Sequence, residues 1–477
     1  MKEELIDKII REVKGINISE IIGSDIRLKK SGNNFDGVCP FHNDHKIGSF
    51  KVNDQKGIFK CFACGVGGDS IKYYASRKGL NYIESAIELS FMFSIITLEE
   101  YNYLKSKRFT KKDSDVIEKM YIEKAIKDYR KKIATIDILD KVYSILSKKG
   151  QSLSEKLSLE HYNHLKDERK LSEEEIIDGG YFTMPSRKNL KSILAEIENK
   201  FNGLDVLKEV PGFFYDEKKE NFSFVYMKGI GIPVRDYKGQ ISGIQVRKDN
   251  VEEKTNKDGT VSKTSRYIWF SSDFMNAKEG YKYGTGTISP CDVVYPKEIK
   301  GKTIFITEGR FKAQAIAKEF NSIAISIQGV TTWRSLVFDI EEIVSYFNLN
   351  NLFVTFDADM AYNPAVYRQA LNMTNELSKY FKNVYYVMWD VDDGKGIDDL
   401  INSCTSTSAI NEKIDKMNKE EFDTHYNKFM KKIYDKYKTQ NNKILATNEE
   451  IKDCFDSIVL SNFNKFAVWK LLNRGKD

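Results

Sequence analysis

The chain has 477 residues, of which 41% are hydrophobic and 30% charged, and this length is enough for about three or four domains. No stretch approaches the roughly 20 apolar residues of a membrane span, and the N-terminus is an amphipathic, mixed-charge segment, so the composition excludes membrane-spanning and disordered classes. The formal net charge of +6 permits a nucleic-acid partner without requiring one. We expect a cytoplasmic monomer that makes no membrane contact.

The first 100 residues contain a cluster of cysteine and histidine. Cys39 and His42 are separated by two residues, Cys61 and Cys64 likewise, and 18 residues lie between the pairs. Each short-spaced pair can turn both ligands toward one point, and four such ligands complete a tetrahedral zinc shell without an open position. The pattern therefore predicts structural Zn²⁺; the alternative is two unrelated turns that contain soft ligands.

The segment between the two pairs alternates β-type residues with lysines, and three aromatic residues accompany it: Phe50, Phe59 and Phe62. Lysines can hold phosphates while aromatic rings stack on bases, which would hold a single strand with little sequence readout. The same rings can instead pack a small core that depends on the metal. The sequence leaves both interpretations open.

Residues 101–205 are rich in lysine and glutamate and show helical periodicity, which predicts a helical connector. His161 and His164 could share a face of one helix, but no further ligand pattern accompanies them. We therefore expect both histidines to be solvated.

Residues 206–295 change to aromatic and β-branched runs broken by glycine, which predicts a β-rich domain with a hairpin around Lys238 and Gly239. The domain also carries four cations of interest: Lys228, Arg235, Arg247 and Arg266. Taken alone, these cations are interpreted as solvated charges.

In residues 296–404, short apolar runs alternate with helical stretches, which predicts a mainly parallel sheet covered by helices. The run TIFIT ends in Glu308, and the run LFVTF is followed by Asp357 and Asp359. Carboxyl ends of parallel strands share one edge of a sheet, where open α/β sheets bind ligands. Because side chains alternate along a strand, Asp357 and Asp359 are expected to point the same way and share a cation.

A third apolar run, VYYVMW, leads into the acid-rich glycine loop DVDDGKGIDD, which includes Asp398. Oxygen ligands from three strand ends can hold Mg²⁺ or Mn²⁺ and, through the metal, phosphates. The alternative makes each acid a helix N-cap or a loop residue.

These motifs together resemble bacterial-type replicative primases. The stretches ISEIIGSDIRLKKSGNNFDGVCPFHND and FKCFACGVGGDSIKYY are similar to the zinc ribbon at the head of those enzymes. The order of Glu-Gly, Asp-Ala-Asp and an acid-rich glycine loop resembles the TOPRIM domain, which primases share with topoisomerases and some nucleases. KGIGIPVRDYKGQISGIQVRK is similar to the segment that precedes TOPRIM and completes the polymerase core.

The resemblance implies that Glu308, Asp357 and Asp359 are catalytic metal ligands, with Asp398 as a further ligand. It also implies that a set of cations contacts the template and the incoming nucleotide: Lys228, Arg235, Arg247 and Arg266.

The sequence departs from the primase pattern at two places. These primases carry an acid four residues after the glutamate, where this chain has Lys312, and their final Asp-x-Asp appears here only as Gly396, Ile397 and Asp398. We expect a weaker second metal site, or a direct contact of Lys312 with phosphate. Lysine-containing versions occur among primase-like proteins of phages and mobile elements, which the chain resembles more.

The predicted fold class is multidomain α+β and α/β. The predicted order is a zinc-ribbon DNA-binding domain (1–100), a helical connector (101–205), a basic β-rich part of the polymerase core (206–295), a TOPRIM catalytic domain (296–404) and a helical C-terminal region (405–477). The predicted activity is that of a DNA primase, which joins ribonucleoside triphosphates into RNA primers on single-stranded DNA; a replicative helicase is a further expected partner. The alternatives are a TOPRIM nuclease or topoisomerase-like enzyme and a non-catalytic zinc-ribbon DNA-binding adaptor.

Overall fold

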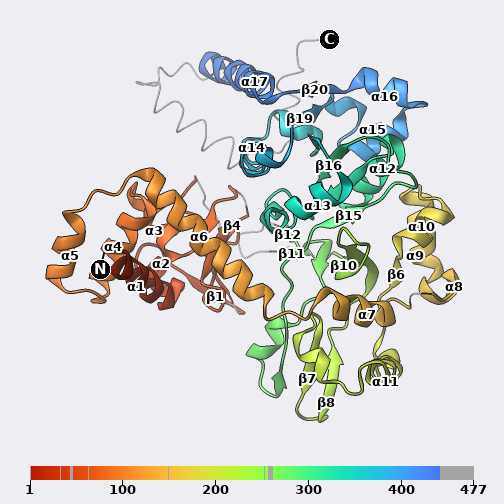
Figure 1. Ribbon diagram of the computed structural model, residues 1–477, viewed down its shortest axis with the longest axis horizontal. Helices are drawn as coiled ribbons and strands as arrows, with labels where there is room; N and C mark the ends of the chain where they lie inside the picture. Colours follow the sequence, from red (N-terminus) through yellow and green to blue (C-terminus); the bar gives the residue numbers. More distant parts are fainter. Residues whose placement is uncertain are drawn as a thin grey trace. The chain divides into compact units, whose positions relative to one another are not determined.

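The computed structural model describes residues 2–440, except positions 33, 43–46, 63, 149, 252 and 256–260. The chain divides into two units, and Figure 1 shows their helices and strands. Among the described residues, the first unit contains 2–127, 362–367 and 426–440, and the second contains 128–361 and 368–425. Of the predicted helical C-terminal region, residues 441–477 lie outside the described residues.

The first unit packs helices beside a small antiparallel sheet. The strands, in their order across the sheet, are β1 (Lys29–Ser31), β2 (Asn34–Gly37), β3 (Phe50–Asn53), β4 (Ile58–Cys61) and β5 (Gly67–Gly68). The helices are α1 (Lys2–Gly15), α2 (Ile18–Gly23), α3 (Ser70–Lys78), α4 (Tyr82–Met92), α5 (Leu98–Lys105) and α6 (Lys111–Arg130).

Local sequence signals set the ends of these helices. A capping box starts α4, since the Asn81 side chain accepts the Glu84 amide at 2.9 Å and the Glu84 side chain accepts the Asn81 amide at 3.1 Å. Gly79, with a φ of 66°, ends α3 in the left-handed conformation that glycine adopts without steric cost. The apolar faces of α1 and α4 then bury Ile9, Ile10 and Ile83 completely, which stabilises the helix pair.

The second unit starts with helices that cover two antiparallel sheets. The first sheet has the order β13 (Tyr267–Trp269), β10 (Ile241–Lys248), β9 (Gly229–Arg235) and β6 (Phe182–Thr183), and the second the order β14 (Tyr281–Lys282), β7 (Phe213–Asp216) and β8 (Asn221–Phe224). A separate ladder joins β11 (Glu253–Thr255) and β12 (Val261–Lys263). The helices are α7 (Ile136–Leu146), α8 (Leu153–Lys156), α9 (Leu159–Asn163), α10 (Glu173–Gly179) and α11 (Leu190–Phe201).

The predicted hairpin is present: β9 and β10 pair in antiparallel register around a turn in which Gly239 has a φ of 80°. The helices of the predicted connector do not stand apart from this sheet. Val142 of α7 is fully buried in one cluster with Ile244 and Val246 of β10, because the apolar face of α7 needs a partner surface. Residues 128–205 therefore belong to the same unit as the strands.

A six-stranded sheet forms the remainder of the second unit. Its order is β15 (Asp292–Val294), β17 (Ile323–Ser326), β16 (Thr303–Thr307), β18 (Asn351–Val354), β19 (Asn383–Met388) and β20 (Asp415–Met417). The four central strands are parallel, as predicted, and β15 and β20 are antiparallel edges. The sheet thus takes in strands on both sides of the predicted segment 296–404.

Helices cover both faces of this sheet. They are α12 (Arg310–Phe320), α13 (Ile340–Phe347), α14 (Pro364–Leu377), α15 (Ile397–Ser403) and α16 (Thr407–Lys413), and α17 (Lys419–Gln440) follows β20. Figure 1 shows α12 and α15 side by side near β16. Phe305 of β16 packs with Ala313 and Ile316 of α12, while the Tyr386 hydroxyl of β19 lies 2.6 Å from the Thr374 hydroxyl of α14.

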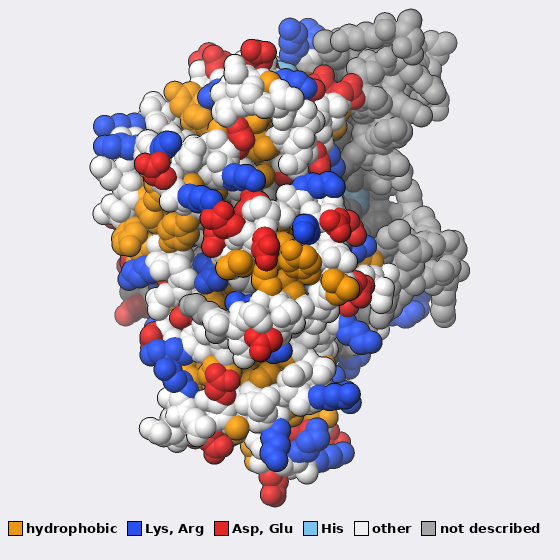
Figure 2. All heavy atoms as spheres, turned by 90° about the vertical axis from the view of Figure 1, so that its right-hand side faces the viewer, with side chains coloured by type: hydrophobic (Ala, Val, Ile, Leu, Met, Phe, Trp, Pro, Cys, Tyr) orange, Lys and Arg blue, Asp and Glu red, His pale blue; other side chains and the backbone are white. Residues whose placement is uncertain are grey.

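Charged side chains of both signs are interspersed on the face shown in Figure 2, and its described residues form no large region of a single sign. This mixing agrees with the small net charge of +6. None of the helices in the described part of the chain combines the length and apolar character that a membrane span requires. A site for a charged ligand therefore depends on a few neighbouring side chains rather than on a large surface of one charge.

Candidate functional site

The four predicted zinc ligands lie together in the first unit. Cys61 ends β4, Cys39 follows β2, and the potential ligand atoms of Cys39, His42, Cys61 and Cys64 all lie within 4.8 Å of one another. The Sγ atoms of Cys39 and Cys64 are 3.8 Å apart. Zinc–sulfur bonds of about 2.3 Å in a tetrahedron place two sulfurs about 3.8 Å apart, so the donor set fits zinc.

The crowding of thiol groups in this cluster also favours a bound cation. Hydrogen bonding with Cys61 and Cys64, together with burial, raises the pKa of the Cys39 thiol above its ordinary value. Crowded thiols resist the loss of a second proton, whereas a bound metal ion stabilises the thiolates. Gly65, with a φ of 76°, turns the chain after Cys64 and donates its amide to the Cys61 carbonyl at 3.0 Å.

The three aromatic residues near the zinc ligands have different surroundings. Phe50 and Phe59 are at most 1% exposed and pack against each other at 5.5 Å between ring centroids, with Tyr73 beside them. Phe62 is 69% exposed, and the Lys60 ammonium lies 5.6 Å from its ring centroid. Two of the rings therefore form the core of the ribbon, and Phe62 is available to a ligand.

In the second unit, Glu308 follows β16 and Asp357 follows β18 at one edge of the parallel sheet. The Asp357 amide donates to Glu308 Oε1 at 3.4 Å. Burial raises the pKa of the Glu308 carboxyl, and the negative charges of Asp357 and Asp359 raise it further against the opposing effect of Lys312. The predicted acids thus share one electrostatic environment.

The predicted reason for the proximity of Asp357 and Asp359 is wrong. Strand β18 ends at Val354, and Asp359 lies in a 3-10 turn at Ala358–Ala361, so strand alternation does not orient the two side chains. A turn brings Asp359 back instead: the Met360 amide donates to the Asp357 carbonyl at 2.8 Å. The Ala358 amide donates to the Lys395 carbonyl at 3.0 Å, which ties this turn to the acid-rich loop.

Lys312 lies among these acids. Its ammonium forms ion pairs with Asp357 and, at 3.4 Å, with Glu308 Oε2. Burial by itself lowers the pKa of Lys312, but the carboxylates of Glu308 and Asp357 outweigh burial and raise it. Among the described residues, the zinc ligands are the one group of three or more His, Cys, Asp or Glu side chains whose ligand atoms lie close enough together to hold a metal ion, and the acids around Lys312 do not form such a group.

Asp398 joins this cluster from the first turn of α15. Burial raises the pKa of its carboxyl, as does Asp399, while Lys312 and Arg169 lower it. A Cβ placed on Gly396 would lie 2.3 Å from Asp398 Oδ1 and 3.1 Å from Lys312 Cε. Glycine at this position therefore lets the acid and the lysine approach the loop closely.

The four cations predicted to contact template and nucleotide do not all lie in one group. Burial lowers the pKa of Arg247, and its electrostatic neighbours include Arg169 and Arg266, so three arginines lie near one another. The Nε of Arg247 is buried without a hydrogen-bond partner among the described residues. Arg235 instead has Arg310 and Asp292 as neighbours, and Lys228 is an exposed residue before β9.

Sequence reasoning missed Arg169 in this group. Its guanidinium lies 4.7 Å from the Phe311 ring centroid and donates to the Tyr267 hydroxyl at 3.2 Å, and its charge acts on Asp398. Arg169 thus connects the arginines of the β-rich part to the acids. The only signal in the sequence is the run KDERK, which resembles any solvated helix face.

The expectation that His161 and His164 are solvated is wrong. The His161 ring is hydrogen-bonded on both sides, by Thr183 Oγ1 at 2.8 Å and Asp249 Oδ1 at 2.9 Å, and the residue is 6% exposed. His164 contacts Glu168 at 2.8 Å, and burial lowers its pKa. Polar partners distant in sequence satisfy the buried ring of His161, which is therefore structural. His164 instead pairs with a residue four positions away, and its buried Nε2 has no hydrogen-bond partner among the described residues.

Comparison with known protein families identifies two segments of the chain. Residues 1–104 match the family model of the CHC2 zinc finger, and residues 297–407 match a domain of unknown function, DUF3854. The first match and the ligand geometry confirm the predicted structural zinc site. The second match assigns no chemistry to the acid cluster.

The chain is similar in sequence to bacterial DNA primases, as predicted. The DNA primase of Aquifex aeolicus is 27% identical over 391 residues, which are 81% of this chain and 59% of that protein. The DNA primase of Helicobacter pylori strain 26695 is 40% identical over 88 residues, which are 18% of this chain and 16% of that protein. The chain thus spans less than two thirds of the relatives that it matches.

Among solved structures, the zinc-binding and RNA polymerase domains of the Aquifex aeolicus primase align with a TM-score of 0.41 and 20% identity. That alignment covers 99% of this chain and 97% of the other.

Proposed function

We propose that this protein is a DNA primase that joins ribonucleoside triphosphates into short RNA primers on single-stranded DNA. The observation that carries the proposal is the presence, in one chain similar to bacterial primases, of a CHC2 zinc finger and an acid cluster at the edge of a parallel sheet. The parallel sheet and its acids support the TOPRIM domain that the sequence predicts.

The acid cluster suits a divalent metal because several buried carboxylates repel one another there. Burial raises the pKa of Glu308 most, and the charges of Asp357 and Asp359 raise it further, while Lys312 lowers it. Glu308, Asp357 and Asp359 would hold Mg²⁺ or Mn²⁺, with Asp398 as a further ligand. When bound, the metal lowers the pKa of the attacking 3′-hydroxyl and neutralises the triphosphate.

Arginine side chains of this chain would neutralise further negative charge on the phosphates. Arg169, Arg247 and Arg266 lie close enough to influence one another, and such mutually repelling guanidiniums are stabilised by a phosphate between them. Arg169 also acts on Asp398, so a phosphate held by the arginines lies toward the acids. These side chains would orient the template and the incoming nucleotide for displacement at the α-phosphate.

The zinc ribbon would hold the template strand. Phe62 offers an exposed ring beside the Lys60 ammonium, and this pairing suits a base and its phosphate. Phe50 and Phe59 stabilise the ribbon from within and are not available to DNA.

Primer synthesis on single-stranded DNA tests the proposal. The purified protein is incubated with template, Mg²⁺ and labelled ribonucleotides, with and without a replicative helicase, beside an Asp357→Ala, Asp359→Ala variant. We expect short, template-dependent products, reduced at least about a hundredfold in the variant because the metal ligands are lost. Asp392→Ala removes an exposed acid from the loop after β19 and serves as the matched control.

Two other outcomes decide against the proposal. Metal-dependent cutting of DNA without synthesis would indicate a nuclease or topoisomerase-like enzyme. Binding of DNA with neither synthesis nor cutting would indicate an adaptor, a function that the ion pairs of Lys312 with the acids would suit.

A further inference from the structure

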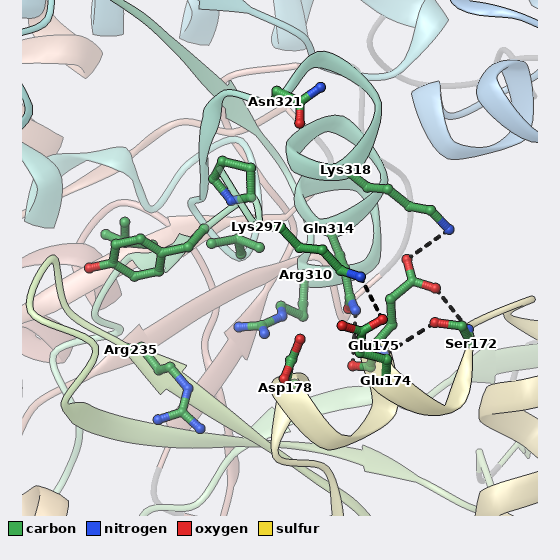
Figure 3. Close-up of a pocket in the computed structure, with 15 residues that line it drawn as sticks. Ser172, Glu174, Glu175, Asp178, Arg235, Lys297, Arg310, Gln314, Lys318 and Asn321 are labelled. Atoms are coloured by element: carbon green, nitrogen blue, oxygen red, sulfur yellow. Dashed lines mark hydrogen bonds and ion pairs between the residues drawn. The ribbon is translucent and has the colours of Figure 1, made fainter. Parts of the chain in front are cut away.

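A pocket of about 520 Å³ lies within the second unit, between α10, α12 and the chain that follows β15. Its size is within the range of small-molecule sites. Figure 3 shows charged side chains from these elements around it. Arg310, Gln314 and Lys318, spaced four residues apart on α12, form one wall, whereas Lys312 of the same helix contacts the acid cluster.

The two lysines of the pocket are already paired. Lys297 Nζ lies 2.5 Å from Glu174 Oε2, and Lys318 Nζ lies 3.1 Å from Glu175 Oε1. Figure 3 shows both pairs on the side of the pocket formed by α10. The lysines are 73% and 66% exposed, so these pairs contribute little stability and can be exchanged for a ligand.

A buried carboxylate, Asp292, pairs with one of the two arginines of the pocket. Arg310 Nη1 donates to both oxygens of Asp292, at 3.0 and 2.8 Å, and the Asp292 side chain is fully buried. The Arg235 guanidinium donates to the Gly239 carbonyl at 3.1 Å and forms no ion pair with an acid among the described residues. Burial and the neighbouring Arg310 lower the pKa of Arg235, so an anion beside it would be stabilising.

Asp178 is the complementary group on the α10 side. It is exposed, and its carboxylate forms no hydrogen bond or ion pair with any described residue. In Figure 3, Arg235 lies on one side of the pocket, the glutamates of α10 lie on the other, and Asp178 lies between them. Among the described residues, the pocket therefore contains one arginine that forms no ion pair, Arg235, and one carboxylate that accepts no hydrogen bond, Asp178.

The chain at Gly180 lets α10 end close to Arg235. Gly180 has a φ of 68°, and a Cβ placed there would lie 2.7 Å from Arg235 Nη2. The left-handed backbone therefore favours glycine at this position. Tyr295 also lines the pocket and is 37% exposed, so its ring offers a flat surface to an aromatic ligand.

We propose that this pocket binds a small phosphorylated ligand of mononucleotide size, with its phosphate at Arg235, its base beside Tyr295 and a hydroxyl or amino group at Asp178. The site is separate from the acid cluster and needs no divalent metal, because the arginine supplies the positive charge.

Titration calorimetry with AMP tests the proposal on the full chain without divalent metal. We expect one binding site, and affinity reduced at least about tenfold by Arg235→Gln, since a charge-assisted hydrogen bond is lost. Because Arg235 is half-buried, Asp178→Asn serves as a second variant at an exposed position and should weaken binding similarly. Lys300→Gln, which removes an exposed lysine paired with Glu298, should bind as the wild type does.

Further ligands and one variant separate this site from others. Inorganic phosphate and adenosine should each bind more weakly than AMP, and the Asp357→Ala, Asp359→Ala variant should keep its AMP affinity. No binding of AMP at millimolar concentration, unchanged affinity in the pocket variants, or equal affinity for AMP and either fragment would overturn the proposal. Loss of binding in the acid variant would also overturn it.

Discussion

Lys312 places a positive charge among the carboxylates of the acid cluster. Its ammonium pairs with Asp357 and Glu308 and lowers the pKa of Glu308, which burial and the charges of Asp357 and Asp359 raise. A lysine at this position neutralises carboxylates permanently, whereas an acid would add a metal ligand. The structure thus shows the contact of Lys312 with the acids, and a direct contact of Lys312 with phosphate stays a prediction.

Lys312→Met should therefore destabilise the second unit by about 3 kcal/mol without divalent metal, because it leaves buried carboxylates uncompensated. Urea unfolding with and without Mg²⁺ measures this loss, and Mg²⁺ should restore part of it if the acids bind the metal. The loss should shrink at acidic pH. Glu308 has a folded-state pKa above its unfolded value, and protonation below that pKa removes the uncompensated charge.

Lys395→Met is the matched control, since Lys395 contacts the same Asp357 at 3.4 Å but is 67% exposed. Its loss should cost less than about 1 kcal/mol. Equal effects of the two substitutions would contradict the assigned role of Lys312.

At the scale of elements, the turn between β4 and β5 contributes to the zinc site and also presents an exposed aromatic ring. It supplies Cys61 and Cys64 to the metal, and it leaves Phe62 exposed between them. Because the flanking cysteines fix the backbone, the ring is presented with little loss of conformational entropy on binding.

Phe62→Ala should weaken binding of single-stranded oligothymidine by about 1 kcal/mol, or roughly fivefold, because stacking on one base is lost. Fluorescence anisotropy at a fixed salt concentration measures the change. Phe91→Ala, at an exposed aromatic of α4, should leave the affinity unchanged. An identical loss in both variants would assign the effect to the fold rather than to stacking.

At the scale of the whole molecule, the two units depend on different sources of stability. The first unit has a small sheet whose core includes the zinc ligands Cys39, Cys61 and Cys64. The second buries larger clusters around α7 and α12 that contain no zinc ligand. Removal of zinc should therefore destabilise the first unit more than the second.

Cys61→Ser should abolish zinc binding and hydrogen-exchange protection in peptides from residues 34–68, with protection kept in peptides from residues 303–388. Exchange mass spectrometry and metal analysis measure both. In primer assays the same variant should lose initiation more than extension of a preformed primer. Cys404→Ser changes a cysteine outside the zinc cluster and is the control; protection lost in both regions would refute the independence of the units.

The zinc ligands were predictable from the sequence because ligand spacing within a tight turn is a local property. The parallel sheet was predictable for a similar reason, since apolar runs that alternate with helical stretches determine the class of fold. The edge strands β15 and β20 were not, because each is short and is stabilised only by pairing with a strand distant in sequence.

The sequence by itself therefore determined the zinc site, the hairpin at Gly239 and the strand ends that carry Glu308 and Asp357. Only the tertiary structure decided the partners of the charged groups: Lys312 with the acids, Arg169 with Arg247, and Arg235 with the pocket. The physical reason is that spacing along the chain fixes local turns and periodicity. The surroundings of a long cationic side chain depend instead on which elements pack against it.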